Sequence, residues 1–155
     1  MVNTTPIIAL SLVGQLDLLK HLYAEVMIPE AVRAEILAGG RRAGAAELEE
    51  RTWIQVVPVD DLARAQLLSD LDRGEAEVIA LAQERNVGLV LLDERLARRH
   101  AERLGLNVTG TLGVLLRAKR AGLISQVGPV ARQLQAAGIW IQQDVVQRLL
   151  ELAGE

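Results

Sequence analysis

GLVLLDERLARRHAERLGLNVTG, residues 88–110, alternates between two kinds of hydrophobic pattern. GLVLLD (88–93) and LNVTG (106–110) are short aliphatic runs of the kind found in buried strands, and the residues between them have helical spacing. Strands that are apolar on both faces and alternate with helices form parallel sheets that are covered on both sides. This stretch therefore predicts an α/β fold.

The same alternation extends along the rest of the chain. Further strands are predicted at 25–29 and 54–59, and residues 1–3 are predicted as a very short first strand. Thr5-Pro6 supports that first strand, because Thr at an N-cap with Pro at the first helical position begins many helices. Helices are predicted at 6–13, 15–23, 30–38, 45–51, 61–71, 75–85, 94–104, 111–121, 129–137 and 142–153. We expect a three-layer α/β/α sandwich with a central, mostly parallel sheet of 4–5 strands.

Length and composition exclude several kinds of protein. The chain of 155 residues fits a single domain, 1–155, in which residues from about 125 to 155 form a helical C-terminal extension. Phe is absent and there are only 2 Trp and 1 Tyr, too few to bind single strands by stacking bases, and the net charge of −3 argues against simple coating of phosphate backbones. The absence of Cys excludes disulfides and thiolate ligands. Because the apolar run 6–14 is too short to span a bilayer, we expect a cytoplasmic protein without a membrane segment.

Asp93 is the first candidate for a functional side chain. Ligands of open parallel sheets bind beyond the carboxyl ends of the strands, and Asp93 ends the most apolar strand of the chain. The alternative role is an N-cap of the helix that follows, and the two roles are compatible.

The helix RGEAEVIALAQER (73–85) separates two glutamates by its geometry. Glu75 falls on the apolar stripe with Val78 and Ile79, whereas Glu77 falls on the opposite side. A carboxylate on a buried stripe needs a cation or several donors facing it. The alternative for Glu75 is a favourable charge at a helix N-terminus, and for Glu77 that role or simple solvation is the preferred interpretation.

A third carboxylate, Glu35, lies in IPEAVRAEIL (28–37) at the edge of the predicted core face. By itself this position is ordinary. The full order gives it weight: a polar residue ends strand 1, a Glu follows strand 2, a second Glu starts a helix before a buried strand, and an Asp ends that strand.

This ordered set resembles the PIN-domain family of metal-dependent ribonucleases, which includes the VapC-type toxins. The likeness is closest to its bacterial and archaeal branch of predicted nucleic-acid-binding proteins. The resemblance covers nearly the whole chain and lies in VNTTPIIAL, IPEAVRAEI, GEAEVIALA, VLLDERLARRHAERLGL, VTGTLGVLLRAKRAGLI and GIWIQQDVVQRLLELAGE. It implies that Asn3, Glu35, Glu75 and Asp93 bind Mg²⁺ or Mn²⁺ and catalyse hydrolysis of RNA phosphodiesters. Hard divalent cations select such oxygen ligands, and they lower the pKa of bound water.

Asn3 departs from the family pattern, because most active members carry Asp at this position. An Asn side chain offers a carbonyl oxygen but no charge, so the quartet supplies three negative charges rather than four. Two divalent ions roughly 4 Å apart repel each other strongly, which makes a second metal doubtful.

Weaker candidates surround these four residues. Arginines near the predicted site are candidates for RNA phosphate contacts, although each alone is better explained as a solvated charge. Three threonines are candidates for supporting roles, and one of them, Thr111, is also a natural N-cap. His100 is expected to be packed or half-buried rather than catalytic. The candidate arginines are Arg41, Arg42, Arg95, Arg98 and Arg99, and the candidate threonines are Thr4, Thr109 and Thr111.

Two functions from different classes stay open at this point. The first is a Mg²⁺- or Mn²⁺-dependent ribonuclease, the toxin of a toxin–antitoxin pair, with RNA as substrate, a small antitoxin protein as partner and a homodimer as assembly. The second is a PIN-like nucleic-acid- or protein-binding module with weak or no catalysis, because Asn3 replaces the usual Asp. The chain contains no phosphate-binding GxxxxGK[ST] motif, and GGRRAG (39–44) lacks the strand-turn-helix setting of a dinucleotide fingerprint.

Overall fold

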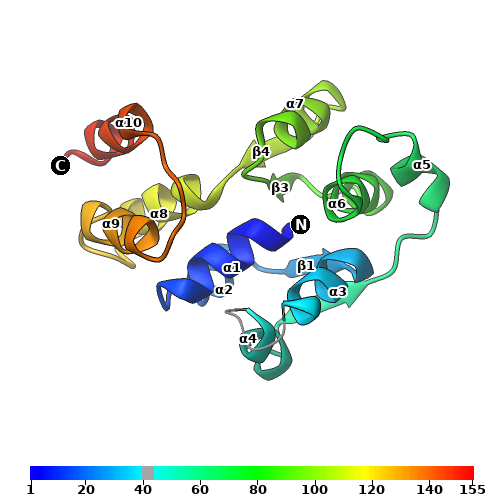
Figure 1. Ribbon diagram of the computed structural model, residues 1–155, viewed down its shortest axis with the longest axis horizontal. Helices are drawn as coiled ribbons and strands as arrows, with labels where there is room; N and C mark the ends of the chain where they lie inside the picture. Colours follow the sequence, from blue (N-terminus) through cyan, green and yellow to red (C-terminus); the bar gives the residue numbers. More distant parts are fainter. Residues whose placement is uncertain (40–43) are drawn as a thin grey trace.

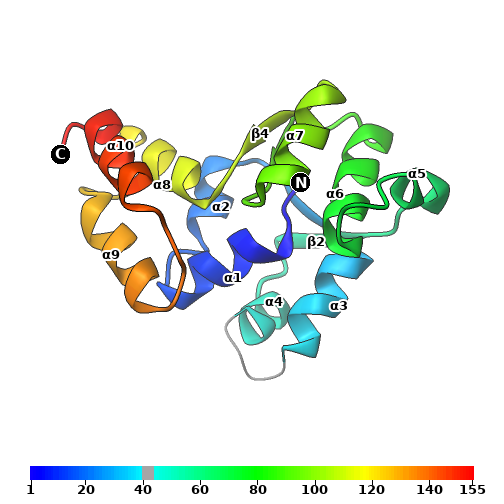
Figure 2. The ribbon, with the colours of Figure 1, turned by 45° about the horizontal axis from the view of Figure 1, so that its top comes forward.

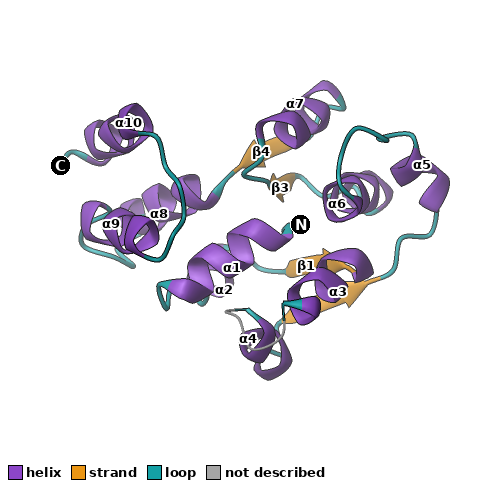
Figure 3. Ribbon diagram, viewed as in Figure 1, coloured by secondary structure: helices purple, strands orange, loops and turns teal. Residues whose placement is uncertain are grey.

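The computed structural model describes residues 1–39 and 44–155, which form an α/β fold (Figure 1). Helices make up most of it and surround short strands (Figure 3). The helices are α1 Thr4–Leu12, α2 Leu18–Leu22, α3 Glu30–Ala38, α4 Ala45–Glu50, α5 Leu62–Gln66, α6 Arg73–Glu84, α7 Arg95–Arg103, α8 Thr111–Arg120, α9 Gly128–Ala136 and α10 Gln143–Ala153. The strands are β1 Val26–Pro29, β2 Ile54–Val57, β3 Leu89–Leu91 and β4 Asn107–Thr109.

The strands pair in parallel, as the sequence predicts. β1 pairs with β2, with Val26 opposite Ile54, and β3 pairs with β4, with Leu91 opposite Thr109. Helices occupy the crossovers in both cases, which parallel pairing requires.

Residues 1–3 lie between these two pairs. The Val2 N–H donates to Met27 O of β1 at 3.0 Å, the Leu91 N–H of β3 donates to Met1 O at 2.8 Å, and the Asn3 N–H donates to Leu91 O at 3.1 Å. Because α1 begins at Thr4, this segment forms only an isolated parallel bridge, between Val2 and Leu91. In the described part of the chain the assigned ladders are therefore two two-stranded sheets, rather than the expected single sheet of four to five strands.

The start of α1 differs from the prediction. The helix begins at Thr4 with Asn3 at the N-cap, so the assignment of Thr5 as N-cap and Pro6 as the first helical residue is wrong. Pro6 is still in the first turn, where its missing N–H leaves no helical hydrogen bond unmade. The earlier start places Asn3 and Thr4, rather than Thr5, at the junction between strand edge and helix.

Most other predicted helices agree with the structure within a few residues. The largest difference is α5, which ends at Gln66 instead of extending to 71. Leu67 is 84% exposed, and the chain turns there toward Asp72, which caps the next helix. The residues between Gln66 and Asp72 are needed for the turn that joins α5 to α6, so α5 ends before them.

Aliphatic side chains form the core, as the absence of Phe requires. Ile7 and Leu10 of α1, Ile79 and Leu81 of α6 and Leu115 of α8 are all fully buried. Trp140, by contrast, is 80% exposed. Within the described residues, no helix is both long and apolar enough to cross a bilayer.

The C-terminal residues form α9 and α10, which lie beside α8 at the end of the molecule farthest from α5 (Figures 1 and 2). Glu155, which follows α10, bonds to α8 and to the start of α9. Its Oε1 accepts from Lys119 Nζ at 2.6 Å and from the Val127 N–H at 2.7 Å, and its Oε2 accepts from the Gly128 N–H at 2.9 Å. The hydrogen bond from Lys119 is the main cause that lowers the pKa of Glu155 to about 2.

Because this pKa is lowered on folding, the Glu155 carboxylate stabilises the folded state above its ordinary pKa of 4.5, and the contribution disappears as the pH falls through about 2. We expect Glu155→Gln to lower the melting temperature at neutral pH and to have progressively less effect between these two values. Thermal melts followed by circular dichroism test this, with Glu151→Gln, an exposed residue of α10, as the control. A Glu155→Gln effect that is constant with pH would contradict the assignment.

Candidate active site

Asn3 lies where the N-terminal segment meets α1. Its backbone N–H donates to Leu91 O, which places it beside the end of β3. The side chain is 3% exposed and does not cap α1. Its Oδ1 is buried and has no hydrogen-bond partner within the described residues. A buried oxygen without a donor is costly, so this atom is available to a ligand.

The carboxylate of Glu35, on α3, accepts a hydrogen bond from Thr4 and occupies the space beside Gly74. Thr4 Oγ1 donates to Glu35 Oε2 at 2.5 Å. The same carboxylate lies against Gly74 at the start of α6, where an added Cβ would be 2.7 Å from Oε1 and 2.8 Å from Oε2. Residue 74 is therefore a glycine because the Glu35 carboxylate occupies the space that a side chain would need.

Glu75 follows Gly74 and is 5% exposed, which confirms its predicted place on the buried stripe. Its N–H donates to Asp72 Oδ1 at 2.7 Å, and its Oε2 accepts from the Asp72 N–H at 3.3 Å, so the two residues form a capping box. Oε1 is buried and unpartnered within the described residues. Burial, and after it the carboxylate of Asp72, raises the pKa of Glu75, with smaller contributions from Glu94 and Glu35.

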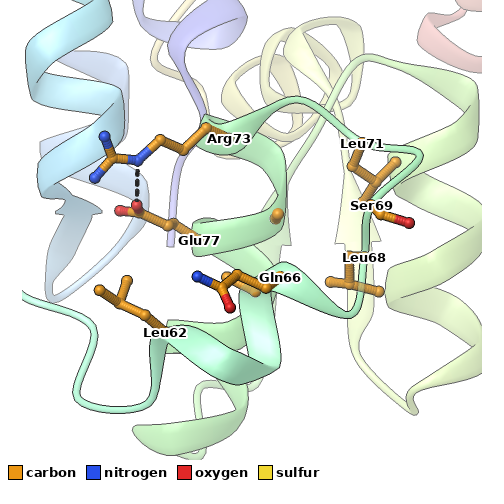
Figure 4. Close-up of a pocket in the computed structure, with 9 residues that line it drawn as sticks. Leu62, Gln66, Leu68, Ser69, Leu71, Arg73 and Glu77 are labelled. Atoms are coloured by element: carbon orange, nitrogen blue, oxygen red, sulfur yellow. Dashed lines mark hydrogen bonds and ion pairs between the residues drawn. The ribbon is translucent and has the colours of Figure 1, made fainter.

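Glu77 is only 2% exposed, so simple solvation, one of the two roles expected for it, is wrong. Its Oε2 accepts from the Ala31 N–H of α3 at 3.2 Å, and its Oε1 accepts from Arg73 Nε at 2.7 Å (Figure 4). It thereby links α6, which carries Glu75, to the first turn of α3, which carries Glu35. Ala76 and Ala80 lie on the same face of α6 as Glu77, and both are buried. Their small apolar side chains are the signal in the sequence that this face is buried.

Asp93 is a cap, but for a different helix from the predicted one. Its Oδ1 accepts from the Thr111 N–H at 2.8 Å and its Oδ2 from Thr111 Oγ1 at 2.6 Å, so it caps α8 rather than α7. The N-cap of α7 is Glu94, without a side-chain hydrogen bond. The predicted N-cap role of Thr111 is wrong, because α8 begins at Thr111 with Gly110 as the N-cap.

Thr4 and Thr111 contact Glu35 and Asp93, and the other weaker candidates are dispersed. Arg98 Nη1 donates to Leu92 O at 2.9 Å, at the end of β3. Arg95 and Arg99 are exposed on α7, and Arg41 and Arg42 lie outside the described residues. Thr109 lies over Gly113 and lines a separate pocket on α8.

His100 pairs with Asp70 and not with Glu35, Glu75 or Asp93. Its Nε2 lies 2.9 Å from Asp70 Oδ2, and its side chain is 22% exposed. This agrees with the half-buried position expected for it. The hydrogen bond from His100 is the largest cause that lowers the pKa of Asp70.

The four principal candidates are connected through their neighbours in the chain. Thr4, next to Asn3, contacts Glu35, whose carboxylate contacts Gly74, next to Glu75. Asn3 also bonds to Leu91, two residues before Asp93. Over residues 1–39 and 44–155, no Lys, Arg or His forms an ion pair with any of the three carboxylates.

The chemistry of this donor set fits a hard divalent cation. All four side chains offer oxygen, and two buried oxygens, Asn3 Oδ1 and Glu75 Oε1, have no partner in the described residues. Nevertheless, the described part of the chain contains no group of three His, Asp or Glu side chains close enough to hold a metal ion. An ion bound here would therefore need the Asn3 amide or water to complete its ligands.

A buried carboxylate that faces other carboxylates destabilises the folded state once it ionises. Because the pKa of Glu75 is raised on folding, this penalty is absent below its ordinary value of 4.5 and grows as the pH rises above it. We expect Glu75→Gln to raise the melting temperature of the protein in EDTA at about pH 8, by about 3 °C for a gain of about 1 kcal/mol, and to have little effect at about pH 4.

Differential scanning fluorimetry at the two pH values measures this difference. Glu102→Gln, at an exposed position of α7, is the control for loss of one negative charge. A Glu75→Gln variant that is less stable than the wild type at the higher pH would show that the carboxylate is satisfied as it stands.

Comparison with known protein families gives one match. A family model described as a PIN domain matches residues 1–155. No curated protein and no solved structure matches the chain. The match includes Asn3, Glu35, Glu75 and Asp93, which together we call the acidic edge. The chain therefore belongs to the PIN-domain family.

Proposed function

We propose that this protein is a metal-dependent endoribonuclease that hydrolyses RNA phosphodiesters at the acidic edge formed by Asn3, Glu35, Glu75 and Asp93. Membership of the PIN family supports a nuclease-type, nucleic-acid-binding module of the kind that generally uses divalent metals. One observation carries the proposal: Asn3 Oδ1 and Glu75 Oε1 are buried oxygens without a partner in the described residues, where Glu35, Glu75 and Asp93 also form no ion pair. The cofactor is Mg²⁺ or Mn²⁺, because these ions select oxygen ligands.

Each residue of the edge has a distinct part in this proposal. The Thr4 hydroxyl and the space over Gly74 orient Glu35, and Thr111 orients Asp93 with two hydrogen bonds. Glu75 presents one oxygen without a partner in the described residues, and burial, followed by the carboxylate of Asp72, raises its pKa. A bound divalent ion supplies positive charge for the charge that develops on the phosphate in hydrolysis.

The amide at position 3 limits how many ions this edge is able to hold. Three carboxylates carry three negative charges, and Asn3 adds an oxygen without charge. Two divalent ions roughly 4 Å apart need more compensation than this. We therefore propose a single ion.

A second candidate function is a PIN-like binding module with little or no catalysis. The observation that favours it is that no three acidic or His side chains converge on a metal position within the described residues, in keeping with an Asn where active members carry Asp. The roles of toxin with a small antitoxin partner, of homodimer and of Arg95, Arg98 and Arg99 as RNA contacts are further proposals that follow the family.

An RNA cleavage assay with Mn²⁺ separates the two candidates. We expect Asp93→Asn to lower the rate by about 100-fold and Asn3→Asp to raise it by about tenfold, because they remove and add charge at the metal. Gly74→Ala keeps every ligand, but its Cβ would be 2.7 Å from Glu35 Oε1. We expect it to lower the rate about tenfold with little change in melting temperature, because the flexible Glu35 side chain moves aside.

Matched controls make this assay decisive. Glu102→Gln removes a negative charge far from the edge and is expected to cleave as the wild type does, and EDTA is expected to abolish cleavage. Melting temperatures identify a variant that is merely unfolded, which matters for Asp93 because it caps α8. Equal background cleavage by the wild type, Asp93→Asn, Asn3→Asp and Gly74→Ala would overturn the nuclease proposal and leave the binding module.

A further inference from the structure

A second concave site lies along α8, outside the acidic edge. This pocket of about 570 Å³ is lined by Tyr23, which follows α2, by Thr109 at the end of β4, and by one face of α8 that includes Gly113, Arg117 and Arg120. We call it the α2–α8 pocket. α2 and α8 pack against each other, and α8 also contacts α1 (Figure 2).

The charge of the α2–α8 pocket is positive and uncompensated. Its lining residues include two arginines and no carboxylate. Neither Arg117 nor Arg120 forms an ion pair within the part of the chain that the structure describes. The Arg117 guanidinium lies 5.6 Å from the centre of the Tyr23 ring, so a cation–π contact joins two residues that line the pocket. In a chain of net charge −3, two free guanidinium groups in one concave site favour an anion.

Hydroxyl groups complete the donor set. Thr109 Oγ1 lies so close above Gly113 that a Cβ there would collide with it, which explains a glycine in this helix turn. The Tyr23 hydroxyl is buried and has no hydrogen-bond partner among the described residues. Two guanidinium groups and two hydroxyls offer donors in several directions, which matches a tetrahedral group with several oxygens better than a single carboxylate.

We propose that the α2–α8 pocket binds a phosphate group, either of a mononucleotide or of an RNA backbone. The pocket is separate from the acidic edge: Thr111 binds Asp93 at the first turn of α8, and Arg117 is six residues farther along, roughly 9 Å down the helix axis. If the phosphate belongs to RNA, the pocket holds substrate for the proposed nuclease, and in that case alone it rests on the proposed function.

Binding measured in EDTA tests this proposal without any cleavage. The probes are inorganic phosphate and adenosine monophosphate, followed by calorimetry, and a short fluorescein-labelled single-stranded RNA, followed by anisotropy. We expect Arg117→Gln and Arg120→Gln each to weaken binding about tenfold or more, because each removes a positive charge and several N–H donors. Tyr23→Phe removes one hydroxyl donor and is expected to weaken binding about threefold. Arg132→Gln, at an exposed position of α9, should bind as the wild type does.

The probes also distinguish the two sources of phosphate. Binding of adenosine monophosphate as tight as that of RNA identifies a free nucleotide ligand. Binding of RNA alone, with a salt dependence that falls by about one unit in each arginine variant, identifies a backbone phosphate. Binding of no probe, or equal weakening by Arg132→Gln and by the pocket variants, would overturn the proposal. Arg120 does not contact Tyr23 in the cation–π pair, so its variant stays informative if Arg117→Gln is unstable.

Discussion

Hydrogen bonds of three N-terminal residues hold the two strand pairs together, and the candidate site depends on them. The Val2 N–H donates to β1, and Met1 O and the Asn3 N–H bond to Leu91 in β3. A parallel pair of strands is too small to be stable alone, so this segment joins two incomplete sheets into one core. The same bonds bring Asn3 and Thr4 to the edge where Glu35 and the end of β3 lie.

Capping interactions then give the acidic edge its form. Asp72 caps α6 and orients Glu75, and Asp93 caps α8 through Thr111. Glu77 joins the starts of α3 and α6. Neutral N–H and O–H groups orient Glu35, Glu75 and Asp93, whereas Glu77 also accepts from the Arg73 guanidinium. Burial, and after it the charge of Asp72, raises the pKa of Glu75 within this edge.

Much of this fold was predictable from local pattern, because aliphatic runs and helical periodicity are properties of short segments. Asn3, Glu35, Glu75 and Asp93 were predicted as a site from the resemblance of their order to the PIN-domain family, which local periodicity alone does not supply. Periodicity failed for Glu77, since it assumes one buried face, whereas α6 packs against α3, α5, α7, β1 and β3. It also failed for the partner of Asp93, because the cap joins residues 18 apart in sequence, across a helix and a strand. Tertiary contacts decide both cases.

The central claim is that Asn3, Glu35, Glu75 and Asp93 form one oxygen-lined site for a divalent cation. Mn²⁺ titration followed by electron paramagnetic resonance counts the bound ions directly. The account predicts one ion per chain in the wild type, tighter binding or a second ion in Asn3→Asp, and marked loss in Glu75→Gln. No bound Mn²⁺ in the wild type, or the same binding in all three proteins, would contradict it.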